Sequence, residues 1–300
     1  MVARRLGFRR AGRPCHDSIV TLRATLTLNT IGSRPRRTKY SPPVAPSVHP
    51  DAQPYEGGRG PAGVLLCHGF SGSPKSMIGW AGHLEAAGFQ VSLPRLPGHG
   101  TNWQELNQTS WIDWYSTVDD AFASLRAQCD QVFVAGLSMG GALALRLAQQ
   151  HGPLVSGLTL VNPVVNITDP RMSALPALRL VLPSLAGIVN DIARPGQDEC
   201  GYDRLPLRAL YSQTFLWADV RRNLGRVDQP LLVYRTVHDH VVDSSSVRLI
   251  KACVRSTDQT YIELQRSYHV ATLDYDAEDI FDGSVAFFRR LAKEGDGTAE

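Results

Sequence analysis

The sequence predicts an α/β fold with a doubly wound, mostly parallel sheet and a helical cap inserted after the sixth strand. Three observations support this prediction. From Pro61 onward, short apolar runs alternate with helix-length segments, which is the pattern of βαβ units. These apolar runs lack polar alternation, as expected for strands covered by helices on both faces. Between Asn162 and Val227 the alternation stops, which indicates an insertion.

The apolar runs place the individual elements. Strands are expected at residues 63–67, 89–93, 132–135, 158–161, 231–234 and 260–264. Helices are expected at residues 76–87, 111–128, 139–150, 244–252 and 277–292. Within the insertion, apolar residues recur at helical spacing but are interrupted by prolines; they are Leu178, Leu182, Leu185 and Val189. We therefore expect a helical insertion above the sheet.

Charge divides the chain into two parts. Residues 1–43 carry nine Arg and one Lys against one Asp, a net charge of +9, whereas residues 44–300 carry 21 basic and 27 acidic residues, a net charge of −6. We expect the first part to be a disordered basic extension, with a transit peptide or a misplaced start codon as alternatives. Residues 44–300 are expected to form one domain, and their acidic balance argues against a nucleic-acid partner.

Composition also bears on the compartment. The five cysteines are widely and irregularly spaced, which fits reduced thiols better than a disulfide framework or a metal site. No run of 18 apolar residues occurs, so we expect no transmembrane segment. The stretch at 18–31 is too interrupted by polar residues to act as a secretory signal. We therefore expect a cytoplasmic protein.

The most informative segment is VFVAGLSMGGA at 132–142, where an apolar strand runs through G-x-S-x-G into a helix. A lone G-x-S-x-G is a weak pattern, but the strand-to-helix context is the one that a nucleophile elbow requires. In such a sharp turn Ser138 takes a strained backbone, and Gly136 and Gly140 avoid collisions around it. The sequence therefore predicts Ser138 as a nucleophile.

Two backbone N–H groups are expected to stabilise the negative oxygen of a tetrahedral intermediate. The nucleophile turn supplies the N–H of Met139, and a Gly-rich loop at 68–72, which follows a buried strand, supplies that of Phe70. His68 in this loop is expected to brace it, because a second histidine downstream is better placed to act as a base.

The acid and the base are expected after later strands, in the order Ser, acid, His. Asp239 follows the strand at 231–234, and His269 follows the strand at 260–264. Asp243 is the rival acid, but a helix-start role explains it without catalysis. His269 would take the Ser138 proton while Asp239 holds the imidazole tautomer. Neither metal-ligand spacing nor a phosphate-binding glycine motif is present, so no metal and no cofactor are expected.

Four segments closely resemble bacterial monoacylglycerol lipases and the small thermostable carboxylesterases, which have the α/β-hydrolase fold. They are GVLLCHGFSGSP (63–74), LPRLPGHGT (93–101), FVAGLSMGGALAL (133–145) and SYHVATLDYD (267–276). The resemblance implies a cap over about residues 164–226 that shields an acyl channel. It further implies that Ile188 lines the pocket mouth and that Glu199 hydrogen-bonds the glycerol hydroxyls. Glu199 could equally be a solvated cap residue.

These observations predict a serine hydrolase of fatty-acid esters, most specifically of monoacylglycerols. A broad short- or medium-chain carboxylesterase is the first alternative. A non-catalytic member of the fold that only binds ligands is the second, and the complete set of Ser138, Asp239 and His269 argues against it. The expected partner is a small-molecule ester, with transient contact to a lipid surface.

Overall fold

The computed structural model describes residues 46–296. Its main sheet has seven strands in the order β1-β3-β2-β4-β5-β8-β9, and every neighbouring pair is parallel except β1 with β3. The strands are β1 (Tyr55–Gly57), β2 (Ala62–Cys67), β3 (Gln90–Leu93), β4 (Gln131–Leu137), β5 (Gly157–Val161), β8 (Leu231–Thr236) and β9 (Gln259–Leu264). The predicted doubly wound, mostly parallel sheet is confirmed.

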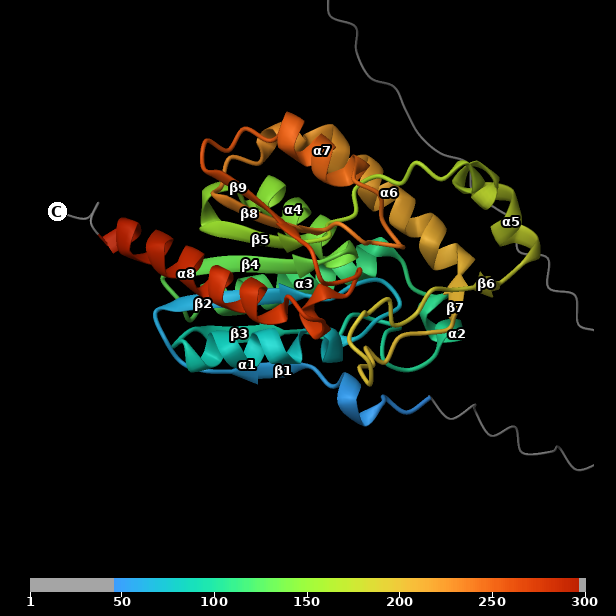
Figure 1. The fold of residues 1–300 in the computed structure, drawn as a ribbon, viewed down its shortest axis with the longest axis horizontal. Coiled ribbons are helices and arrows are strands. Elements are labelled where there is room, and N and C mark those ends of the chain that lie inside the picture. Colours follow the sequence, from blue (N-terminus) through green and yellow to red (C-terminus); the bar gives the residue numbers. More distant parts are fainter. Residues whose placement is uncertain (1–45, 297–300) are drawn as a thin grey trace, which may run out of the picture. The chain divides into compact units, whose positions relative to one another are not determined.

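Helices cover both faces of this sheet (Figure 1). The α-helices of the described residues are α1 (Ile78–Ala86), α2 (Trp103–Leu106), α3 (Trp111–Arg126), α4 (Met139–His151), α5 (Leu175–Val181), α6 (Leu207–Asn223), α7 (Ser245–Cys253) and α8 (Ala277–Asp296). α3 begins at a capping box in which the Ser110 amide donates to Asp113 Oδ2 (2.8 Å). Among the described residues, no helix is both long and apolar enough to cross a membrane.

The sheet divides the core into two apolar clusters. One cluster joins the sheet to α1 and α8 and includes Trp80 and Phe288. The other joins the opposite face to α3, α4 and α6 and includes Trp114. Successive residues of β2 enter different clusters, Leu65 the second and Leu66 the first. Because both faces of the strands are buried, their sequences contain no polar alternation.

An insertion separates β5 from β8. It contains α5, α6 and an antiparallel pair formed by β6 (Ser184–Ala186) and β7 (Arg204–Pro206). Its predicted place after the sixth strand is wrong: five strands of the main sheet precede it. Within the described residues, the short strand β1 is the only one before β2, so the insertion follows the fifth strand.

The apolar spacing from Leu178 to Val189 does not form one helix. α5 ends at Val181 because Pro183 forces the preceding Leu182 into an extended conformation (φ −120°, ψ 129°). The longest helix of the insertion is instead α6. Its buried side chains recur every three or four residues and include Leu207, Leu210, Trp217 and Val220.

A glycine of α8, Gly283, tests how this helix packs on the sheet, and a glycine of α1, Gly82, serves as the comparison. A Cβ on Gly82 in α1 would meet nothing within 4 Å, whereas a Cβ on Gly283 in α8 would collide with the hydroxyl of the buried Tyr234. We expect Gly82→Ala to raise the free energy of unfolding by about 0.5–1 kcal/mol, because alanine favours helices. We expect Gly283→Ala to lower it by about 1–3 kcal/mol through overpacking.

Urea denaturation of the two variants measures both effects. Adding Tyr234→Phe to Gly283→Ala removes the colliding hydroxyl and should recover part of the loss. If Gly283→Ala instead stabilised the protein as Gly82→Ala does, Gly283 would not lie against Tyr234 of β8 as described.

Candidate active site

Ser138 lies in the sharp turn between β4 and α4. Its backbone has φ 56° and ψ −116°, a conformation that non-glycine residues seldom adopt. A Cβ on Gly136 would collide with the backbone of Gly140, and a Cβ on Gly140 would collide with the Cys67 carbonyl. The Ser138 amide donates to the carbonyl of Val161 (2.9 Å). The tight fit of the turn against β2 therefore requires both glycines of the motif.

The Gly-rich loop after β2 passes beside this serine. A Cβ on Gly69 would lie 3.5 Å from the Cβ of Ser138. The buried His68 ring braces the loop, since the Leu96 amide donates to its Nε2 (3.2 Å) and its Nδ1 lies 3.0 Å from the Gly69 carbonyl oxygen. Burial lowers the pKa of His68 to about 4, so the ring is neutral at pH 7. His68 thus has the bracing contacts expected from the sequence.

Phe70 and Met139 carry the two N–H groups predicted to bind an oxyanion. Phe70 follows Gly69 in the loop beside Ser138, and Met139 is the first residue of α4. The first N–H groups of a helix have no partner within it and carry the positive end of its dipole. The fold therefore brings both residues close to Ser138, and their binding of an oxyanion stays a prediction.

His269 lies in the loop between β9 and α8, and its side chain links two others. Its Nε2 is 2.9 Å from Ser138 Oγ, and its Nδ1 is 2.8 Å from Asp239 Oδ2. The loop is fixed through its backbone: Asn162 Nδ2 donates to the His269 carbonyl (2.7 Å), and the His269 amide donates to Asp191 Oδ2 (3.1 Å). The three residues predicted as nucleophile, base and acid thus form one continuous hydrogen-bonded chain.

Asp239 lies in the loop after β8 and is oriented by its own neighbours. Its Oδ1 accepts hydrogen bonds from the amides of Val241 (2.8 Å) and Val242 (2.7 Å), while its Oδ2 contacts His269. Burial raises the pKa of this carboxyl, but the charge of His269 and the hydrogen bonds outweigh burial and lower the net pKa. Asp239 is therefore ionised at pH 7.

His269 is buried beside several carboxyl groups. Burial lowers the pKa of its imidazole, but Asp239, Glu199 and Asp191 together outweigh burial and raise the net pKa. A proton on His269 is therefore stabilised by negative charge on more than one side.

Asp243, the rival acid, is engaged elsewhere. Its Oδ2 accepts hydrogen bonds from the amide (3.2 Å) and the hydroxyl (2.5 Å) of Thr168, and its Oδ1 accepts one from the Ser245 amide (2.6 Å). Burial raises its pKa, but these hydrogen bonds outweigh burial and leave the pKa well below its usual value. Asp243 thus ties the insertion to the first turn of α7.

Glu199 and Ile188 both lie in the insertion, between β6 and β7. The Glu199 side chain accepts a hydrogen bond at Oε1 from the Asn190 amide (3.1 Å), and a Cβ on Gly72 would lie 2.8 Å from its Oε2. Burial raises the pKa of Glu199, although Asn190 and His269 oppose this shift. Ile188 is 59% exposed. Of the two, the structure brings Glu199 toward the loop beside Ser138.

Sequence reasoning missed Asn162 and Asp191. Asn162 follows β5, and its Oδ1 accepts a hydrogen bond from the Thr236 amide (2.8 Å) while its Nδ2 holds the His269 carbonyl. A polar residue at the carboxyl end of a buried strand is a signal that could have identified it. Asp191 lies in an irregular loop of the insertion, where no periodicity or motif marks it.

Two other features share no residue with the hydrogen-bonded chain of Ser138, His269 and Asp239. His49, Asp51 and Cys200 could bring three ligand atoms within 4.8 Å of one another, but the Lys75 ammonium lies 2.9 Å from Asp51 and already supplies positive charge there.

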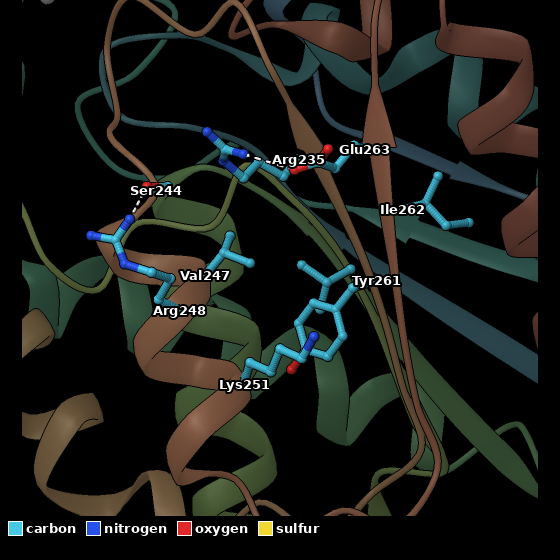
Figure 2. Close-up of a pocket in the computed structure, with 9 residues that line it drawn as sticks. Arg235, Ser244, Val247, Arg248, Lys251, Tyr261, Ile262 and Glu263 are labelled. Carbon is cyan, nitrogen blue, oxygen red and sulfur yellow. Dashed lines mark hydrogen bonds and ion pairs between the residues drawn. The ribbon is translucent and has the colours of Figure 1, made fainter.

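A surface pocket lies between α7 and β9, and Figure 2 shows Arg235 in it paired with Glu263 (3.1 Å). The residues that line this pocket include none of the hydrogen-bonded chain.

The chain matches the family described as serine aminopeptidase, S33 (Hydrolase_4) over residues 60–276. It belongs to this family of α/β-hydrolases. It is 38% identical over 242 residues to a thermostable monoacylglycerol lipase of Bacillus sp. (strain H-257), covering 80% of this chain and 96% of the relative. It is 24% identical to a carboxylesterase of Bacillus subtilis (strain 168), covering 77% of this chain and 94% of the relative.

Solved structures show the same likeness. One of the structures from a study of LipS and LipT, two metagenome-derived lipolytic enzymes, aligns with a TM-score of 0.79 at 36% identity, covering 81% of this chain and 100% of its own. A monoacylglycerol lipase of Paleococcus ferrophilus shares the fold, with a TM-score of 0.67 at 18% identity, over 79% of this chain and 98% of its own. The resemblance noted from the sequence is confirmed, and the chain is a carboxylic ester hydrolase.

Because Asp239 and Asp243 have different hydrogen-bond partners, substituting each in turn tests which of them is the acid that orients His269. We expect Asp239→Asn to lower kcat on a nitrophenyl ester by on the order of 10⁴-fold, because the amide favours the wrong imidazole tautomer. We expect Asp243→Asn to change kcat by no more than about fivefold, since its hydrogen bonds are to Thr168 and Ser245 and not to His269. If the two results were reversed, Asp243 would be the acid.

Proposed function

We propose that this protein hydrolyses monoacylglycerols to glycerol and free fatty acid, with Ser138, His269 and Asp239 as the catalytic triad. The observation that carries this proposal is the hydrogen-bonded chain from Ser138 Oγ through the imidazole to Asp239 Oδ2, with distances of 2.9 and 2.8 Å. Such a chain is the arrangement by which a serine hydroxyl is activated at neutral pH.

In the first half of the reaction, neutral His269 takes the proton of Ser138 as Oγ attacks the ester carbonyl. Asp239 holds the Nδ1–H tautomer and stabilises the imidazolium that forms. The carbonyl oxygen becomes negative, and the N–H groups of Phe70 and Met139 are the proposed donors to it. The imidazolium then gives its proton to the leaving alcohol, which leaves the acyl group on Ser138. In the second half, His269 activates water by the same steps, and the fatty acid is released.

Glu199 is the proposed partner of the glycerol headgroup. Its carboxylate lies beside the loop that contains Phe70, where a Cβ on Gly72 would approach Oε2 to 2.8 Å. The Ser73 hydroxyl donates a hydrogen bond to the backbone carbonyl of Glu199 (2.9 Å). A partly buried acceptor there could receive hydrogen bonds from the free hydroxyls of a monoacylglycerol. The similarity to the Bacillus monoacylglycerol lipase supports the same assignment.

A broad carboxylesterase is the second candidate. The similarity to the Bacillus subtilis carboxylesterase covers nearly the same share of the chain as that to the monoacylglycerol lipase, 77% against 80%. Simple alkyl esters need the triad but no headgroup site, so Glu199 is the residue that separates the two candidates.

Contact with a lipid surface is proposed for the insertion. Leu180 and Val181 at the end of α5 are 70% and 75% exposed, and Phe215 in α6 is 50% exposed. Where such side chains form a contiguous apolar patch, the patch is typical of surfaces that touch lipid or another protein. The cytoplasmic location stays a prediction.

The headgroup test compares a monoacylglycerol with the methyl ester of the same fatty acid. We expect Glu199→Ala to lower kcat/KM on the monoacylglycerol by about 10- to 150-fold, the equivalent of about 1.5–3 kcal/mol for hydrogen bonds to a charged group. The methyl ester presents no hydroxyls to this site, so its kcat/KM should hardly change.

The exposed neighbour Asp198 gives the matched control, because Asp198→Ala removes a carboxylate from the same segment. Equal losses on both esters in Glu199→Ala would mean that Glu199 supports the insertion's structure. No loss on either ester would favour the broad carboxylesterase.

A further inference from the structure

Asp191 connects the insertion to both loops that hold the proposed acid and base. Its carboxylate, only 9% exposed, contacts His240 twice: Oδ1 lies 2.8 Å from Nδ1, and Oδ2 accepts a hydrogen bond from the His240 amide (3.2 Å). Oδ2 also accepts one from the His269 amide (3.1 Å), and the Asp191 carbonyl accepts one from the Val270 amide (3.0 Å). One residue thus holds the loop after β8 and the loop after β9 together.

We propose that Asp191 is a positioning residue of the reaction, which fixes His269 between Ser138 and Asp239. This inference rests on the proposed function, because it needs His269 as the base. The His240 amide lies directly after Asp239 in the chain, and the His269 amide belongs to the base itself. A shift of Asp191 would therefore change the spacing of acid and base.

The residue before Asp191 extends the same connection to the headgroup site. Asn190 has a positive φ of 54°, its amide donates to Glu199 Oε1 (3.1 Å), and its Oδ1 accepts a hydrogen bond from the Glu199 amide (3.0 Å). Two consecutive residues of the insertion therefore hold the proposed headgroup carboxylate and the base.

The side-chain contact between Asp191 and His240 alone would not carry this role. The His240 side chain is 57% exposed, and pairs of that kind contribute little to stability. The hydrogen bonds from the amides of His240 and His269 are different, because they fix backbone that bears or adjoins the triad. Displacements of about 1 Å in such groups can lower rates by on the order of 10²-fold.

Asp191 also acts on the base through charge. Three carboxyl groups influence His269, those of Asp239, Glu199 and Asp191, and each raises the pKa of the imidazole. The base must be neutral to accept the Ser138 proton, so the reaction slows as the pH falls through this pKa. Removing the Asp191 charge should lower the pKa and move the acid limb of the pH profile to lower pH.

Two substitutions separate hydrogen bonding from charge. Asp191→Asn keeps an acceptor for the backbone amides and removes the charge, whereas Asp191→Ala removes both. We measure kcat and KM on a nitrophenyl ester, and the rate of Ser138 labelling by a fluorophosphonate, across the pH range. Asp191→Ala should lower kcat by about 10- to 100-fold with little change in KM. Asp191→Asn should lower kcat less, and both variants should shift the acid limb to lower pH.

Asp276→Asn is the matched control. Asp276 is also a buried carboxylate that fixes a loop near His269, since it accepts a hydrogen bond from the Arg266 amide (3.0 Å) and pairs with the Arg266 guanidinium (2.7 Å). Its loss should lower the melting temperature without moving the acid limb.

The outcomes distinguish this inference from the proposed function. If both Asp191 variants lost only stability and kept the kcat and acid limb of the natural protein, Asp191 would be purely structural and the inference would fail alone. If labelling of the natural protein had no acid limb, or continued unchanged in His269→Ala, the proposed function would fail and this inference with it.

Discussion

The strained turn at Ser138 is the constraint on which the rest of the site depends. A non-glycine residue with φ 56° and ψ −116° costs on the order of 1–3 kcal/mol, and it persists only where its surroundings fix it. Here the Ser138 carbonyl accepts hydrogen bonds from the amides of Gly141 (3.0 Å) and Val164 (3.1 Å), so α4 and the start of the insertion both help to hold the turn. This conformation places Oγ at the carboxyl end of the central strand β4, within hydrogen-bond distance of His269.

The groups around Ser138 come from separated parts of the chain that meet because the strands are parallel. The loops after β2, β4, β5, β8 and β9 all leave the same edge of the sheet, which is where ligands of open α/β sheets bind. Rigid strands therefore set the spacing of Ser138, Asp239 and His269, while side chains in the loops refine it. Asn162 illustrates this, because it follows one strand and bridges the loops after two others.

Much of this arrangement could be predicted from the sequence, and the rest could not for physical reasons. The buried strands and the G-x-S-x-G turn left strong local patterns, so the predicted strands, the sheet and the proximity of Ser138, Asp239 and His269 agree with the structure. The insertion lacked such patterns: β6 and β7 have three residues each, and Pro183 broke the helical spacing. Asp191 acts through tertiary contacts alone, which no local pattern records. The predicted extension at 1–43 lies outside the described residues.

The proposed mechanism requires Ser138 to be the nucleophile. The most direct measurement is to label the protein with a fluorophosphonate, digest it and locate the adduct by mass spectrometry. We expect one adduct on the peptide that contains Ser138, and loss of both adduct and ester turnover in Ser138→Ala with the fold intact. An adduct on another residue, or turnover that persists in Ser138→Ala, would contradict it.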